Sequence, residues 1–106
     1  RLEAFAVCQC GAGSEAGSGS CYVKFGAARP GPRAEERFER LLDACESFAA
    51  SRGAQRLQAG VNTARSQAYE TLLRRGFRID ILGITMHRPN EPGYSQPDTF
   101  VMDDWR

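Results

Sequence analysis

Apolar positions in the first quarter of the chain follow a two-residue period. Over residues 2–10 the apolar side chains fall on both faces of this alternation, which is typical of an interior strand. Residues 21–25 form a second short apolar run. The intervening residues 11–20 are rich in Gly and Ser and predict a flexible hairpin loop. We therefore expect the two strands to be antiparallel neighbours.

The pattern then changes to a helical period. Residues 33–52 carry apolar side chains at steps of three and four, with Pro32 suited to the first turn and Gly53 to the end of a helix. Residues 55–61 alternate again and predict a strand that is parallel to the strand at 21–25, joined by a right-handed crossover. The apolar stripe of the helix consists of Phe38, Leu41, Leu42, Cys45, Phe48 and Ala49.

The last third predicts a second helix and two further strands. Asn62 or Thr63 can cap a helix that ends at Gly76. Residues 77–86 alternate, with a change of phase at Leu82 and Gly83 that is typical of a β-bulge. A Pro-rich irregular loop over 89–98 and a short strand over 100–102 follow. The prediction is one α/β domain over residues 1–106, with a mixed sheet of about five strands and two main helices.

Composition narrows the function classes. The chain has 106 residues, enough for one small domain, and a formal net charge of +1 without a basic stripe, so a nucleic-acid partner is not expected. No apolar run approaches about 20 residues, so we expect no membrane partner and a cytoplasmic protein. The chain begins at Arg1 without a Met, which suggests the C-terminal portion of a longer or tandem protein.

Four cysteines raise the question of a metal. Cys8 and Cys10 lie on one strand face, Cys21 opens the next strand, and Cys45 lies on the helix stripe. A zinc site usually draws on paired Cys-x2–4-Cys units, whereas this chain has a single Cys-x-Cys, so no metal is expected. Buried reduced thiols acting as small hydrophobes fit better, and a disulfide stays open.

The turn before the long helix is the best candidate anion site. Arg29 and Arg33 flank Gly31, the backbone can come close at Gly31, and a helix start offers unpaired amides to a phosphate. The alternative is a Pro-rich turn that simply begins a helix, with Glu35 and Glu36 satisfying its dipole.

Asn62 and Tyr69 form a second candidate site. Seven residues are two helical turns, so both side chains can look toward one side of a cleft, and a tyrosine is a suitable acid for a leaving thiolate. The alternative gives Asn62 a capping role and Tyr69 a half-buried packing role.

The order strand, strand, helix, strand, helix, strand, strand, with Gly60-Val61-Asn62, Ala68-Tyr69 and Gly76-Phe77, resembles the later two-thirds of the GNAT superfamily of N-acetyltransferases. The family's opening strand and helices are lacking. The resemblance implies acetyl-CoA as co-substrate, bound between two parallel strands that splay apart, and an amine acceptor whose identity it leaves open. It also implies a catalytic acid at Tyr69, with Asn62 lining the cleft; counted back from Gly76, the acid position falls on Leu72 instead.

The resemblance assigns the cofactor to two segments. Backbone groups of Phe25, Gly26 and Ala27 would hold the pantetheine like an added strand, and the turn would hold the phosphates. The phosphate-binding residues implied are Arg29, Gly31, Arg33 and Ala34. Gly31 lies one place early in the family's loop pattern, and Pro32 stands at a glycine position.

Two hypotheses follow. The first is the cofactor-binding portion of an acyl-CoA-dependent N-acetyltransferase. The alternative is a non-catalytic GNAT-like structural or regulatory module that no longer binds acetyl-CoA. Because the opening elements are missing, an exposed sheet edge should need a cover, so we expect a homodimer or attachment to a further domain.

Overall fold

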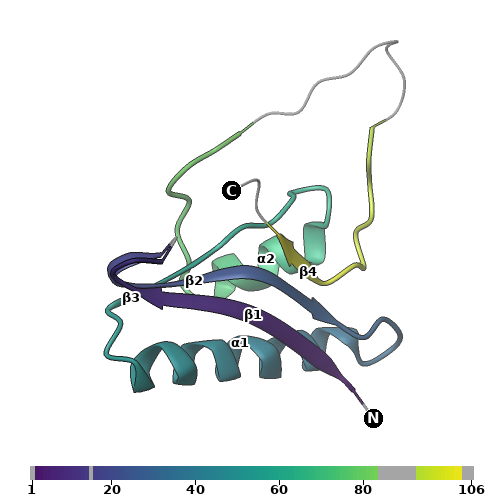
Figure 1. Ribbon diagram of the computed structural model, residues 1–106. Coiled ribbons are helices and arrows are strands. Elements are labelled where there is room, and N and C mark those ends of the chain that lie inside the picture. Colours follow the sequence, from purple (N-terminus) through teal and green to yellow (C-terminus); the bar gives the residue numbers. More distant parts are fainter. Residues whose placement is uncertain (1, 15, 84–92, 104–106) are drawn as a thin grey trace.

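The computed structural model describes residues 2–14, 16–83 and 93–103, and in these it contains four strands and two helices. In chain order the elements are β1 (Ala4–Gly11), β2 (Gly17–Ala28), α1 (Ala34–Ser51), β3 (Arg56–Ala59), α2 (Ser66–Arg74) and β4 (Val101–Asp103) (Figure 1). The fold is α/β with a mixed sheet, as the sequence predicts.

The sheet is built around β2. β1 pairs with it antiparallel, so the hairpin is confirmed. Because β1 ends at Gly11 and β2 begins at Gly17, the connection is shorter than the predicted 11–20. β3 pairs with β2 parallel, as the β2–α1–β3 crossover requires. β4 also pairs with β2, antiparallel, at the other end of the edge that β3 uses.

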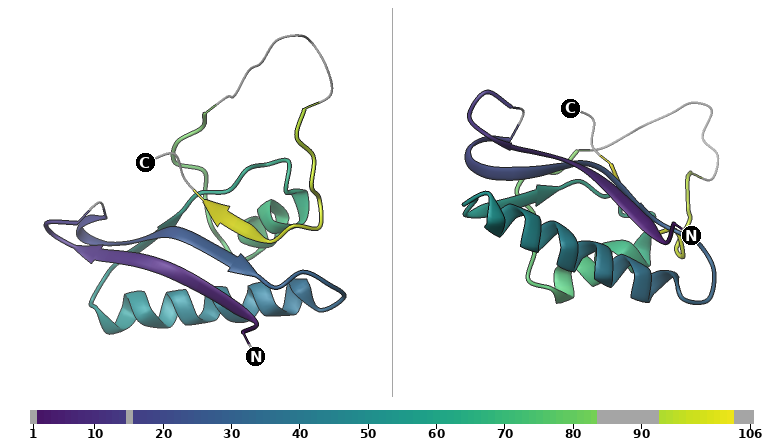
Figure 2. Two further views of the ribbon diagram at one scale, coloured as in Figure 1. Left: turned by 45° about the vertical axis from the view of Figure 1, so that its right-hand side comes forward. Right: turned by 60° about the horizontal axis from the view of Figure 1, so that its bottom comes forward.

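Both helices contribute to one core. α1 runs along one face of the sheet beneath β1 and β2 (Figures 1 and 2). Phe38 and Leu42 of α1 are fully buried, and the Phe38 ring lies 5.3 Å from the ring of Phe100, which leads into β4. The same cluster includes Val23, Ala68, Leu72 and Met102. The helix predicted over residues 33–52 is confirmed, but it is one residue shorter at each end.

The predicted strand over 77–86 is wrong for the residues that the structure describes. Residues 77–83 belong to no helix or strand, and the predicted bulge at Leu82 and Gly83 therefore has no ladder to interrupt. Ile79, Ile81 and Leu82 are exposed. Alternation of apolar and polar residues shows which side chains could share one face of a strand. It does not show that a neighbouring strand is present to form the backbone hydrogen bonds. Residues 84–86 and part of the predicted loop 89–98 lie outside the described residues.

Other boundaries also differ from the predicted ones: β1 is Ala4–Gly11 instead of 2–10, β2 is Gly17–Ala28 instead of 21–25, and β4 is Val101–Asp103 instead of 100–102. β3 covers only Arg56–Ala59 of the predicted 55–61. α2 begins at Ser66, so neither Asn62 nor Thr63 is its N-cap; that position is Arg65. Within the described ranges, neither helix combines the length and the apolar composition needed to traverse a bilayer.

Arg75, at the end of α2, links the two helices through ion pairs with α1. Its guanidinium lies 2.8 Å from a carboxylate oxygen of Glu39, 2.7 Å from Asp43 and 3.0 Å from Glu46, all on one face of α1. The Arg75 side chain is mostly buried, whereas its partners are more exposed. Burial alone would lower the pKa of Arg75, but hydrogen bonds to the three carboxylates raise it above its ordinary value.

Replacing Arg75 should weaken the docking of α2. We expect Arg75→Ala to lower the free energy of unfolding by about 1–2 kcal/mol, less in high salt because the carboxylates are solvated. The matched control is Arg40→Ala, an exposed arginine of α1, which should stay within about 0.5 kcal/mol. Urea denaturation at low and high ionic strength measures both, and equal losses for the two variants would contradict the role given to Arg75.

Candidate functional site

One edge of β2 is shared by two strands that run in opposite directions. Ser20 to Val23 pair with Arg56–Ala59, the whole length of β3, and the chain that follows β3 no longer pairs with β2. Phe25, Gly26 and Ala27 pair instead with Asp103, Met102 and Val101 of β4. β4 therefore lies between β2 and the chain that follows β3 (Figure 2).

Hydrogen bonds tie β4 to both β2 and the chain that follows β3. The amide of Ala28 donates to the carbonyl of Phe100 at 3.0 Å, and the amide of Asp103 donates to the carbonyl of Gly60, just after β3, at 3.0 Å. The three residues predicted to hold a pantetheine thus pair with the chain's own backbone. A Cβ added to Gly26 would lie 2.9 Å from the Met102 Cε, which shows how closely β4 is packed here.

The two arginines of the predicted phosphate turn are engaged elsewhere. Arg29 donates from Nε to the carbonyl of Leu2 at 2.7 Å, which directs it toward the N-terminal segment. Arg33 is exposed and lies 3.0 Å from a carboxylate oxygen of Glu36. Neither side chain lines the cavity beside the helix start. The turn is held by Arg37, which the sequence analysis missed: its Nη1 donates to the carbonyls of Arg29 and Pro30 at 3.1 and 3.3 Å.

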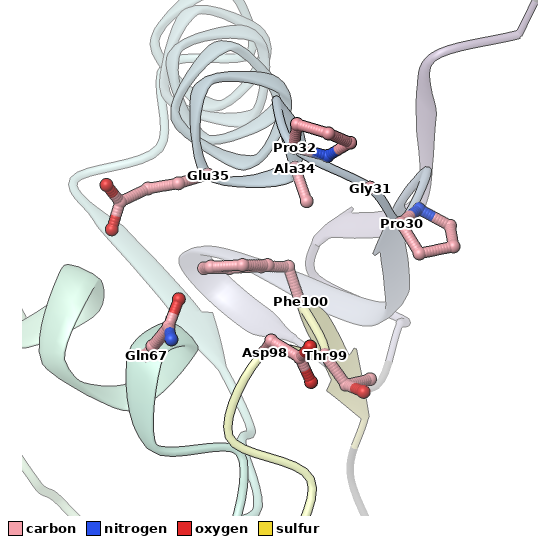
Figure 3. A pocket seen from close by; sticks show the side chains of 9 residues that line it. All are labelled: Pro30, Gly31, Pro32, Ala34, Glu35, Gln67, Asp98, Thr99 and Phe100. Carbon is pink, nitrogen blue, oxygen red and sulfur yellow. The ribbon is translucent and has the colours of Figure 1, made fainter.

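A cavity of about 340 Å³ lies at the start of α1, between the turn, the beginning of α2 and the segment that enters β4 (Figure 3). Gly31 and Ala34, two of the residues predicted to bind phosphate, are among its lining residues. Glu35 and Asp98 also line it, and carboxylates repel a phosphate at close range. Gln67 and Phe100 complete the wall opposite the helix start.

Asn62 and Tyr69 do not meet at this cavity. Asn62 is exposed, and its Oδ1 accepts the amide of Ala64 at 2.9 Å, so its oxygen stabilises the turn before α2. Tyr69 is half-buried on α2. It lies two residues, or about 200° around the helix, from Gln67, the α2 residue that does line the cavity. Leu72, the alternative acid position, is buried in the core.

Arg65 binds both β4 and the segment before it, although no sequence motif identified this residue. Its Nη1 lies 3.0 Å from Oδ1 of Asp103 and its Nη2 lies 3.3 Å from Oδ2, while Nη1 also donates to the carbonyl of Val101. Its Nε donates to the Tyr94 hydroxyl at 2.9 Å, and the guanidinium lies over the Tyr94 ring. The side chain is only 13% exposed. One arginine thus fixes both β4 and the loop that precedes it.

The cysteines form a separate cluster at the other end of the sheet. Cys10 lies opposite Cys21 in the β1–β2 ladder, and Cys8 and Cys45 approach the same core. All four thiols are free. Across the described ranges, no three side chains of Cys, His, Asp or Glu are arranged to hold a metal ion. Burial raises the pKa of Cys8 from its ordinary value of 9.0 to about 11 and that of Cys21 to about 12, with contributions from the neighbouring thiols.

Comparisons with protein-family models, with curated proteins and with solved structures found no match to this chain. The GNAT resemblance therefore stays an inference from the order of elements and the short motifs.

Breaking the contact between Arg65 and Asp103 should loosen β4. We expect Asp103→Ala to lower the free energy of unfolding by about 1–2 kcal/mol, because a mostly buried guanidinium loses its charged partner while Asp103 itself is partly solvated. Glu36→Ala removes an ion pair whose side chains are 59% and 68% exposed, and should cost about 0–0.5 kcal/mol. Faster hydrogen exchange at the Asp103 amide should accompany the first change only. An unchanged rate at this amide would contradict the anchoring role of Arg65.

The buried thiols should make the fold sensitive to alkaline pH. Because the folded-state pKa of Cys21 lies above 9.0, its contribution to stability is fully present below pH 9 and is lost between about pH 9 and 12. The slope attributable to this thiol is at most about 1.4 kcal/mol per pH unit. Urea denaturation between pH 8 and 10 should show a smaller fall in stability for Cys21→Ala than for the wild type. Parallel profiles would contradict the assignment.

Proposed function

We propose that this chain is a non-catalytic GNAT-like module in which β4 occupies the gap that the superfamily uses for acetyl-CoA. The observation that carries the proposal is the pairing of Phe25, Gly26 and Ala27 with Val101–Asp103. These are the backbone groups that the resemblance assigns to the pantetheine. A strand supplied by the same chain competes at a high effective concentration, since its binding is intramolecular.

The surroundings of the helix start support the same proposal. The guanidinium groups of Arg29 and Arg33 interact with Leu2 and Glu36, and the cavity at the helix start is lined by the carboxylates of Glu35 and Asp98. A pyrophosphate bound there would meet negative charge without a cationic side chain in the lining. The turn therefore fits the simpler alternative, a Pro-rich start to an amphipathic helix.

The second candidate is the acyl-CoA-dependent N-acetyltransferase. It is favoured by one observation: the pairing between β2 and β3 ends at Val23 and Ala59, although β2 continues to Ala28. In this reaction the amine nitrogen would attack the thioester carbonyl and the carbon–sulfur bond would break. The thiolate would take a proton from an acid, for which Tyr69 is the candidate, and the proton released by the amine nitrogen, passed through water, would restore that acid. The reaction requires β4 to leave β2 first. Each 1.4 kcal/mol of β4 docking free energy would weaken the apparent cofactor affinity about tenfold.

A titration with acetyl-CoA separates the two candidates. For the non-catalytic module, we expect no rise in the melting temperature of the wild type, or of Asp103→Ala, at millimolar acetyl-CoA. A cofactor at a hundredfold excess over Kd would stabilise the fold by about 2.7 kcal/mol, which a thermal-shift experiment detects readily. Inorganic pyrophosphate at equal ionic strength is the control for non-specific anion effects.

The variants make a positive result interpretable. A shift in the wild type that Arg33→Ala abolishes would overturn the module and support the transferase. A shift confined to Asp103→Ala would also overturn it, because the chain would then retain a cofactor site that β4 blocks. If acetyl transfer to an amine is then observed, unchanged turnover of Tyr69→Phe would remove Tyr69 from the acid role.

A further inference from the structure

The outer edge of β1 is open in the described part of the chain. The sheet order ends at β1, which pairs with β2 on one side and with no described strand on the other. Figures 1 and 2 show β1 along the border of the sheet. A strand edge presents a row of backbone donors and acceptors that can pair with another chain.

The hydrogen bonds of the hairpin identify which groups face outward. The amide of Arg29 donates to the carbonyl of Glu3 at 2.8 Å, so Glu3 faces β2. Backbone groups of successive residues alternate in direction, so Phe5 and Val7 also face β2, whereas Ala4, Ala6 and Cys8 face outward. The amide of Ala28, opposite Ala4, confirms this phase because it donates to Phe100 on the far side of β2.

The register shift after Val7 leaves this alternation intact. Val7 lies opposite Phe25 and Cys8 lies opposite Val23, so the extra residue, Lys24, belongs to β2. β1 itself remains regular over Ala4 to Cys8, and three consecutive outward residues present their amides and carbonyls in phase.

The sequence of β1 lacks the usual protection of an edge. Residues 4–11 contain no charged residue and no proline, two of the devices that prevent edge-to-edge pairing. On the face opposite α1, Phe5 is 43% and Val7 51% exposed, and the Phe5 ring lies 5.7 Å from that of Phe25. An uncharged edge thus adjoins an exposed apolar row.

We propose that β1 pairs antiparallel with β1 of a second copy of this chain, around a two-fold axis at Ala6. In this register Ala6 forms a hydrogen-bonded pair with Ala6 of the second copy, and Ala4 pairs in the same way with Cys8 on each side of the axis. The outward groups that β2 leaves open are then satisfied, and the two sheets become continuous.

The side chains select this register over its neighbours. An axis at Ala6 places Phe5 opposite Val7 of the second copy twice, at non-hydrogen-bonded positions where cross-strand side chains are closest. Glu3 then lies opposite Gln9, so no like charges meet. An axis at Ala4 would oppose Phe5 to Glu3, and an axis at Cys8 would oppose Val7 to Gln9. Only the Ala6 axis pairs both exposed apolar residues with each other.

Hydrogen exchange tests the proposed edge directly. At high protein concentration we expect slow exchange at the amides of Ala4, Ala6 and Cys8, and on dilution we expect these three to become fast. The amides of Phe5 and Val7 should stay slow throughout, because they face β2. Sedimentation velocity should show a species of twice 11.7 kDa over the same concentration range. A monomer at all concentrations, or a dimer in which the Ala6 amide exchanges fast, would overturn the proposal.

A charge exchange across the axis tests the register. Val7→Lys alone and Phe5→Glu alone should each weaken the dimer about tenfold or more, since each places a charge opposite an apolar side chain. The double variant sets the introduced carboxylate opposite the introduced ammonium and should recover most of the affinity. The control Ile81→Lys alters a residue that is 82% exposed elsewhere and should leave the dissociation constant unchanged.

A proline variant separates the dimer from the fold. Ala6→Pro removes an outward amide that makes no bond to β2, so the monomer should keep its circular dichroism spectrum while the dimer is lost. A failure of the double charge variant to recover, together with a stable Ala6→Pro dimer, would show that the copies associate by another surface and would refute the pairing of β1.

Discussion

The pairing of β4 with the second half of β2 is the interaction on which the rest of the structure depends. β2 is twelve residues long, and β3 covers only four residues of its inner edge. Without β4, the peptide groups of Gly26 and Ala28, which point away from β1, would face a gap. With it, the sheet is completed by a segment that arrives from the far end of the chain, and the same segment brings Phe100 and Met102 into the core.

Arg65 makes this arrangement possible because it offers several donors in a fixed plane. A guanidinium can bind both oxygens of Asp103, a backbone carbonyl and the Tyr94 hydroxyl at once, which an ammonium cannot do with the same geometry. Arg37 acts in a similar way on the turn before α1. Arg37 and Arg65, which no motif identified, therefore hold the two segments beside the cavity. Arg29 and Arg33, which the phosphate motif identified, do not line the cavity.

The functional proposal and the proposed dimer concern opposite edges of one sheet. On the inner edge of β2, the chain supplies its own strand, β4. On the outer edge, β1 has kept unpaired peptide groups because the described chain supplies no strand. Both follow from one constraint: backbone donors and acceptors along a strand must find partners. A module that scaffolds by strand pairing would use the outer edge for this and would need no cofactor.

The sequence by itself determined the local elements. The three- and four-residue period specified α1 to within one residue at each end, and the antiparallel hairpin and the parallel crossover to β3 followed from alternation and connection rules. The long-range choices were decided only in three dimensions. Alternation at Phe77, Ile79 and Ile81 predicted a strand, but the segment that pairs with β2 is Val101–Asp103. That segment finds a free strand edge, a core to pack against and an ion pair with Arg65. Contacts between residues 38 apart, such as Arg65 and Asp103, have no periodic signature, and for that reason the closed gap was visible only in the tertiary structure.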